Sequence, residues 1–219
     1  IELLEKGSSE LRLQNIISHK LDSEILLAKV LKNSREKIIT NSKKEVNLQE
    51  ISEFTKLIRR RSSKEPIAYI LKEKEFWSKN FYVNKSTLIP RPETELMVDK
   101  LAKIFKKKRI SILDIGTGSG CILISLLSEL NNSTGLGVDI SNKAIKIAKK
   151  NAIKHRIIKR TKFLRASFSC IFNQKFDLVV SNPPYIKRND LKNLECDIKY
   201  YEPKIALDGG NDGLDVIKK

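Results

Sequence analysis

Cysteine and histidine are scarce in this sequence of 219 residues. The three cysteines, Cys121, Cys170 and Cys196, are far apart and never form a CxxC pair, which argues against a disulfide-stabilised scaffold and favours a reducing compartment. Only two histidines, His19 and His155, accompany them. We therefore expect no zinc site and no other metal centre.

Long apolar runs are also missing. The longest, from Cys121 to Leu127, is far shorter than the ~20 residues needed to cross a bilayer, and no basic–apolar–small leader opens the sequence. Hydrophobic residues still make up 40% of the chain, which excludes wholesale disorder. We expect a soluble, cytoplasmic protein without a membrane partner, built as one large domain or as a small domain plus a standard one.

Acidic residues are too few to balance the basic ones. The chain has 43 Lys and Arg against 26 Asp and Glu, a net charge of +17, and such an excess attracts nucleic acid. The excess is mostly lysine spread over the whole length, and the denser stretches at 59–61 and 106–109 lack the interleaved aromatic residues of a base-stacking surface. We interpret the charge as a solvated surface, so that nucleic acid is a permitted partner but not a required one.

The first 72 residues carry helical patterns and predict a small helical bundle. Asp22 or Ser23 is the expected N-cap of an apolar segment that ends at Leu31. Asn47 is the expected N-cap of a second helix, which Pro66 and the serines before it terminate.

Residues 73–89 predict a hairpin linker, because two β-favouring patches, 76–77 and 81–83, flank a short polar turn. Pro90 and Pro92 then form a rigid, extended entry to a helix that starts near Glu93 or Thr94.

Residues 90–219 predict a Rossmann-like α/β domain. Strand patterns alternate with helix patterns there, as in a parallel sheet with right-handed crossovers. The expected strands are 110–115, 135–140, 161–164 and 176–180, and the expected helices are 121–130 and 141–151.

A glycine-rich loop, Gly116-Thr117-Gly118-Ser119-Gly120, follows the first of these strands and opens a helix. Its glycines allow a tight turn and a close approach to a ligand. Asp139 ends the next strand, where a carboxylate can accept both hydroxyl groups of an adenosine ribose. The alternative is a mere strand–helix turn. The spacing GxGxG favours S-adenosylmethionine over a dinucleotide, because no pyrophosphate has to be placed.

Ser181-Asn182-Pro183-Pro184-Tyr185 follows the fourth strand, where parallel sheets bind ligands. The two prolines stiffen this loop, so that the Asn182 side-chain oxygen and the Pro183 carbonyl can accept both protons of a planar NH2 group. Tyr185 can pack on the flat face of the substrate. Such chemistry needs positioned acceptors and no strong base. The alternative is a proline-stiffened turn.

These motifs resemble those of the HemK/PrmC family, which methylates the glutamine of the GGQ motif in peptide chain release factors. NPPY alone is shared with methyltransferases that act on adenine, guanine or glutamine. The more specific matches lie at Asp22–Leu27, Arg59–Arg61, Glu65–Tyr69, Glu75–Trp77 and Leu88–Glu95. Together with NPPY, the resemblance covers essentially the whole chain.

The resemblance implies an S-adenosylmethionine-dependent methyltransferase domain behind a helical domain that docks the release factor. It implies that Gly116 to Gly120 line the methionine and ribose of the cofactor and that Asp139 binds the ribose. Asn182 then lies between cofactor and glutamine, and Pro183, Pro184 and Tyr185 form the substrate wall.

Two features depart from the family pattern. Ala166 and Ser167 occupy the place of the usual acidic residue near the adenine, so we expect a weaker cofactor affinity or a contact through the backbone, and we count Ser167 among the cofactor-binding residues. The sequence also stops before the family's last strands, so we expect a C-terminally incomplete domain with an exposed sheet edge.

Two other functions stay open at this point. One is a DNA or RNA amino-group methyltransferase, acting on adenine or guanine, which NPPY and the basic charge permit. The other is a catalytically silent fragment that only binds the cofactor.

Overall fold

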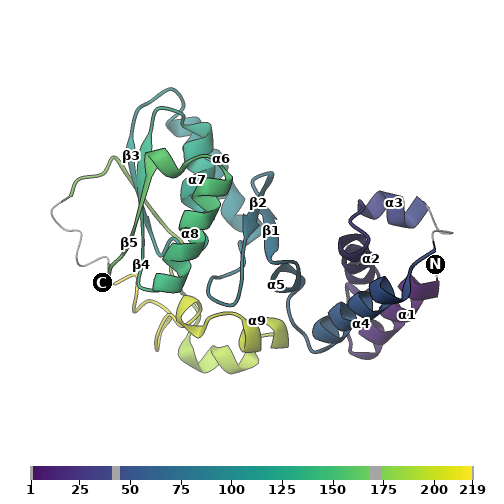
Figure 1. The fold of residues 1–219 in the computed structure, drawn as a ribbon. Coiled ribbons are helices and arrows are strands. Elements are labelled where there is room, and N and C mark those ends of the chain that lie inside the picture. Colours follow the sequence, from purple (N-terminus) through teal and green to yellow (C-terminus); the bar gives the residue numbers. More distant parts are fainter. Residues whose placement is uncertain (1, 41–44, 168–173, 219) are drawn as a thin grey trace. The chain divides into compact units, whose positions relative to one another are not determined.

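The computed structural model describes residues 2–40, 45–167 and 174–218, and the chain divides into two compact units, Ile1–Leu71 and Lys72–Lys219. Within the described ranges no helix is long and apolar enough to span a bilayer. Figure 1 shows both units and labels most of their helices and strands.

The first unit consists of helices. They are α1 (Glu2–Leu13), α2 (His19–Val30), α3 (Arg35–Thr40), α4 (Leu48–Ser62) and α5 (Ile67–Leu71). Fully buried apolar side chains from α1, α2 and α4, among them Leu11, Leu26, Phe54 and Ile58, form its core. The predicted helical region is therefore confirmed.

One N-cap prediction in this unit is right and the other is wrong. Asn47 caps α4 in a reciprocal capping box with Glu50. Helix α2, in contrast, begins at His19, so that neither Asp22 nor Ser23 is its cap. Asp22 is buried and accepts hydrogen bonds from Arg61 Nε at 2.7 Å and from the Ser18 hydroxyl at 2.9 Å. Its carboxylate pairs with a charge on α4, because a buried charge requires a partner.

The second unit opens with a hairpin of β1 (Glu73–Phe76) and β2 (Lys79–Tyr82), followed by the short 3-10 helix η1 (Pro92–Thr94) and α6 (Glu95–Ile104). The sequence predicts this hairpin as a linker between two domains. Its Phe76 and Phe81 side chains belong to the core of the second unit, so the hairpin is part of that unit.

A four-stranded parallel sheet in the order β5-β4-β3-β6 forms the centre of this unit, and Figure 1 labels its strands β3, β4 and β5. Its strands are β3 (Ser111–Ile115), β4 (Thr134–Asp139), β5 (Thr161–Arg165) and β6 (Leu178–Ser181), and the connecting helices are α7 (Cys121–Glu129) and α8 (Asn142–Lys154). The predicted Rossmann-like fold is confirmed. The element ends lie within two residues of the predicted ones, except that α8 ends three residues later than predicted.

Short helical segments complete the chain: η2 (Ile158–Arg160), η4 (Arg188–Asn193), α9 (Cys196–Tyr201) and η5 (Lys204–Ala206). The segment 203–208 lies beside the carboxyl ends of the strands, where it lines the same cavity as the glycine-rich loop.

Candidate active site

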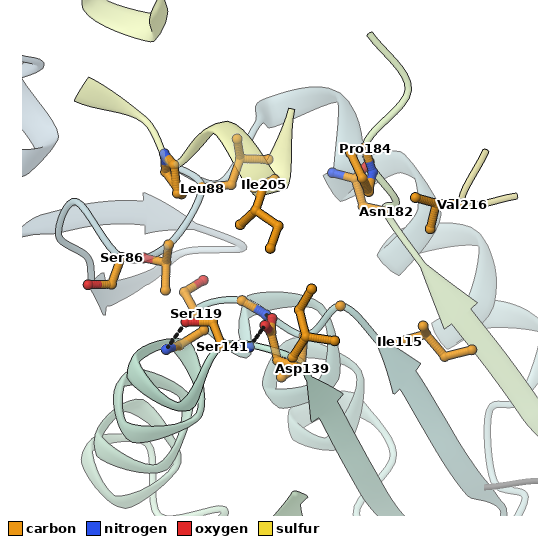
Figure 2. Close-up of a pocket in the computed structure, with 18 of the residues that line it drawn as sticks. Ser86, Leu88, Ile115, Ser119, Asp139, Ser141, Asn182, Pro184, Ile205 and Val216 are labelled. Carbon is orange, nitrogen blue, oxygen red and sulfur yellow. Dashed lines mark hydrogen bonds between the residues drawn. The ribbon is translucent and has the colours of Figure 1, made fainter. Parts of the chain in front are cut away.

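A cavity of about 940 Å³ opens over the carboxyl ends of the parallel strands. It is lined by the loops that follow β3, β4, β5 and β6, by residues from 86 to 94 and by residues from 203 to 208. Asn182 and Pro184 lie across it from Asp139 and Ser141 (Figure 2). This is the edge at which parallel α/β sheets bind ligands.

The glycine-rich loop provides the floor of the cavity. Gly116 and Gly118 have φ values of +73° and +54°, which L side chains rarely adopt. A Cβ atom at Gly116 would meet no atom within 4 Å, and one at Gly118 would meet only the Gly116 carbonyl oxygen, at 3.8 Å. The space above both glycines is therefore open to a ligand.

The other residues of this loop differ in their contacts. Thr117 and Ser119 line the cavity, but the Thr117 hydroxyl donates to Asp114 at 2.7 Å and is buried. Gly120 is not among the lining residues. A Cβ atom there would lie 3.0 Å from Ile124 and 3.3 Å from Ala148, so this glycine allows α7 to pack closely against α8.

Asp139 holds the loop and also faces the cavity. One carboxylate oxygen accepts from the Gly118 N–H at 3.0 Å and the other accepts from the Ser141 N–H at 2.8 Å (Figure 2). A carboxylate oxygen has more than one lone pair. Asp139 can therefore keep both backbone bonds and still accept from the hydroxyl groups of a ligand.

Asp114, which the sequence analysis did not select, lies under the loop with no exposed surface. Among the described residues none donates to its second oxygen. Burial raises the pKa of Asp114 to about 7, the Thr117 hydrogen bond lowers it in part, and the nearby charge of Asp139 raises it further. The signal in the sequence is an acidic residue within an apolar strand, one position before the strand ends.

The NPPY loop places its four residues differently. Asn182 and Pro184 line the cavity, whereas Pro183 is not among the lining residues and the Tyr185 side chain is 64% exposed. Ser181, the last residue of β6, donates its hydroxyl to the Ile115 carbonyl at 2.9 Å. The loop is thereby attached to β3 immediately before Asn182.

Ala166 and Ser167 follow β5 and both line the cavity. The backbone N–H of Ala166 donates to the Asp139 carbonyl at 3.1 Å, which continues the β4–β5 pairing beyond the strand. Both residues therefore line the cavity at the strand next to the one that carries Asp139.

Three further polar residues, Glu202, Arg91 and Asn151, position the walls of the cavity. The sequence patterns do not predict this role. Glu202 is buried and accepts from Arg91 at 2.6 Å and from the Ile89 N–H at 3.2 Å. It joins the wall at 203–208 to the proline-rich segment, across a separation of 111 residues for Arg91. Burial raises the pKa of Glu202 and the Arg91 charge lowers it in part.

Asn151 is the third of these residues. It lies fully buried in α8, where its amide nitrogen donates to the Ser119 carbonyl at 2.8 Å and to the Tyr82 carbonyl at 3.0 Å. Its oxygen accepts from the Tyr82 N–H at 2.7 Å. One side chain thus ties the glycine-rich loop to strand β2.

The arrangement fits a ligand that carries adenosine. A ligand can approach the backbone closely above Gly116 and Gly118, and the Asp139 carboxylate keeps lone pairs that hydroxyl groups could use. The Asn182 side chain lies on the opposite wall (Figure 2). The combination suits a reaction between a nucleoside cofactor and a polar group held by Asn182.

Comparisons with known proteins identify the fold and the family of this chain. The family described as PrmC N-terminal domain matches residues 2–71, and the one described as methyltransferase small domain matches residues 92–196. The catalytic domain of hMettl16, solved in complex with the MAT2A 3′UTR hairpin 6, covers 80% of this chain and is itself covered to 65%, with a TM-score of 0.51 and 17% identity. That likeness supports the methyltransferase fold.

Curated relatives are more similar. A release factor glutamine methyltransferase of Buchnera aphidicola is 42% identical over 203 residues, which cover 93% of this chain and 73% of that protein. The protein of the same name from Caulobacter vibrioides is 38% identical, with 89% and 68% covered. A bifunctional methyltransferase of Rickettsia bellii is 40% identical over 97% of this chain, but the chain spans only 43% of that protein. The chain belongs to the release factor glutamine methyltransferase family.

Proposed function

We propose that this protein transfers a methyl group from S-adenosyl-L-methionine to the side-chain amide nitrogen of the GGQ glutamine in peptide chain release factors. A release factor as substrate places the reaction in the cytoplasm. The observation that carries the proposal is the position of Asn182, which lines the cavity opposite Asp139 directly after a parallel strand. The names of the Buchnera and Caulobacter relatives support the choice of substrate.

S-adenosyl-L-methionine is the cofactor that a methyltransferase family implies, and when bound it supplies an electrophilic methyl group on a sulfonium. Gly116, Gly118 and Asp139 would hold its nucleoside part, and Ala166 and Ser167 would border the adenine. The open space above the two glycines supports this assignment.

The substrate amide requires orientation more than deprotonation. The Asn182 side-chain oxygen and the Pro183 carbonyl accept the two N–H groups of a planar NH2, and they direct the nitrogen toward the cavity. Pro184 forms the adjoining wall, and Tyr185 is exposed on the outer side, where it can meet an incoming polypeptide. Fixed acceptors of this kind cost no reorganisation during the reaction.

The proposal is tested by offering three substrates in one reaction. The full chain is incubated with methyl-labelled cofactor, an intact release factor, a DNA duplex and an RNA hairpin. We expect label in the release factor alone. Label in DNA or RNA would favour the amino-group methyltransferase of nucleic acid, and cofactor binding without any label would favour the silent fragment.

A further inference from the structure

The positive charge of the chain is concentrated in one part of the second unit. Residues 140–167 contain ten Lys and Arg and neither Asp nor Glu, whereas the remaining residues of the chain hold 33 basic and 26 acidic side chains. We call these ten residues the cationic segment. They are Lys143, Lys146, Lys149, Lys150, Lys154, Arg156, Lys159, Arg160, Lys162 and Arg165. Residues 140–167 therefore carry more of the excess positive charge than an even spread along the chain would place there.

The five lysines of α8 share one side of the helix. All five are exposed, while Ala144, Ile145, Ala148 and Ala152 on the other side are buried in the core. The helix has 13 residues and is therefore about 20 Å long. It presents a row of ammonium groups to solvent.

Neighbouring carboxylates do not neutralise this row. Ion pairs that the structure describes involve none of the ten cations. Arg160 and Arg165 donate to backbone carbonyls, and Lys150 lies 3.4 Å from the centre of the Tyr82 ring. The other seven are exposed in the described structure.

The spacing of these lysines costs stability in the isolated protein. Lys146, Lys150 and Lys154 follow one another at i,i+4, where like charges are destabilising by roughly 0.2–0.5 kcal/mol per pair. Lys143 lies in the first turn of α8, which has no acidic residue and where the helix dipole disfavours cations. A polyanion would relieve both effects.

We propose that the cationic segment binds the phosphate backbone of a nucleic acid duplex. A regular row of point charges suits phosphates. Lysine is depleted at protein–protein interfaces, which are enriched in aromatic residues. Within residues 140–167 the aromatic side chains are His155 and Phe163, and Phe163 is buried, so these residues do not form a row of exposed aromatic rings for base stacking.

An anionic membrane fits these observations less well. Stable membrane binding requires an inserted apolar face or a second anchor, and the apolar face of α8 already packs in the core. The expected contact is therefore electrostatic, independent of base sequence and steeply dependent on salt.

The test compares the full chain with two variants of equal charge. One removes three lysines of the segment, Lys143→Gln, Lys146→Gln and Lys154→Gln. The control removes three exposed lysines of the first unit, Lys29→Gln, Lys37→Gln and Lys56→Gln. Binding to fluorescent 20-base-pair RNA and DNA duplexes is measured by anisotropy between about 50 and 200 mM salt, and the melting temperature of each variant is recorded.

We expect both duplexes to bind, with the logarithm of affinity falling linearly with the logarithm of salt concentration. The segment variant should lose at least ~10-fold in affinity at 100 mM salt, and the slope of log affinity against log salt concentration should become shallower by ~2–3. The affinity of the control variant should stay within ~3-fold of that of the unmodified chain. The segment variant should melt no lower than the unmodified chain. A difference in affinity between the RNA duplex and the DNA duplex would identify the preferred one.

Three results would overturn the proposal. The first is an equal loss of affinity in both variants, which would indicate diffuse attraction by net charge. The second is an absence of duplex binding. The third is tighter binding to polyglutamate, or to vesicles containing phosphatidylserine, than to either duplex.

Discussion

The carboxyl group of Asp114 is fully buried beneath the glycine-rich loop, with a pKa raised to about 7 mainly by burial. In the unfolded chain an aspartate titrates near ~3.9. Between these two values the folded protein retains a proton that the unfolded chain has released, so stability decreases as the pH rises through this window. Above the folded pKa both states are ionised and the loss is complete.

Replacing this group by a neutral one should remove the pH dependence. We expect the unfolding free energy of the unmodified protein to fall by about 2–3 kcal/mol relative to Asp114→Asn as the pH rises from 5 to 8. Urea unfolding of both proteins at several pH values measures this difference. The exposed control Asp190→Asn should run parallel to the unmodified protein. Parallel curves for Asp114→Asn as well would show that Asp114 titrates normally.

Asn182 provides the side-chain acceptor for the substrate in the proposed reaction. The substitution Asn182→Ala should lower turnover of a release factor by ~100-fold or more, the scale of one preorganised polar contact in a transition state. Cofactor affinity, measured by calorimetry, should stay within about threefold, because Gly118 and Asp139 lie on the other wall. Asn189→Ala, an exposed asparagine nearby, is the matched control. Near-normal turnover of Asn182→Ala would reduce Asn182 to a turn residue.

At the scale of elements, the NPPY loop depends on a second segment that runs against its backbone. The N–H of Gly209 donates to the Ile186 carbonyl at 2.8 Å, and the N–H of Arg188 donates to the Gly210 carbonyl at 2.8 Å. A Cβ atom at Gly209 would lie 2.8 Å from both the Pro184 carbonyl and the Tyr185 Cα, and 2.7 Å from the Gly213 carbonyl. These are backbone atoms, which cannot rotate away.

The substitution Gly209→Ala should therefore displace the loop that holds Asn182 and Pro184. We expect turnover to fall by ~10–100-fold, because small misplacements of a positioning group cost about that much. Cofactor affinity should change little, and Asn211→Ala, in the exposed part of the same turn, should behave as the unmodified protein. Steady-state kinetics on both variants measure the effect. Unchanged turnover of Gly209→Ala would show that the two segments are mechanically independent.

Local signals explain which of these features the sequence could predict. The Asn47 cap can be predicted because its partner Glu50 lies only three positions away. The strands β3 to β6 can be predicted because each is a short apolar run bounded by residues that favour turns. Asp22 was misassigned because its partner Arg61 lies 39 residues away. Asn151 and Gly209 were missed for the same reason, since their partners are distant backbone atoms that leave no pattern in the sequence.

The site could be predicted in part. Two signals mark it in the sequence, namely glycines directly after a strand and a carboxylate at the end of the next strand. Gly116, Gly118 and Asp139, which carry these signals, line the cavity, whereas Gly120 does not. The exposure of Tyr185 and the inward hydroxyl of Thr117 depend on how the loops pack, which residue types alone do not determine.

In the whole molecule, the two compact units divide the chain so that docking of the substrate and binding of the cofactor can be tested separately. If the first unit docks the release factor, residues 72–219 alone should bind the cofactor as the full chain does. Turnover of an intact release factor should then require a higher substrate concentration, while a short GGQ peptide should be methylated equally well by both. Equal Michaelis constants for the intact factor would refute the docking role.

The most direct test of the proposed reaction is the position of the transferred methyl group. An intact release factor is incubated with the full chain and S-adenosyl-L-methionine, digested, and analysed by tandem mass spectrometry. We expect one added methyl group on the side-chain amide of the GGQ glutamine and none after incubation with Asn182→Ala for the same time. A methyl group on another residue, or an unmodified glutamine beside methylated nucleic acid, would contradict the account.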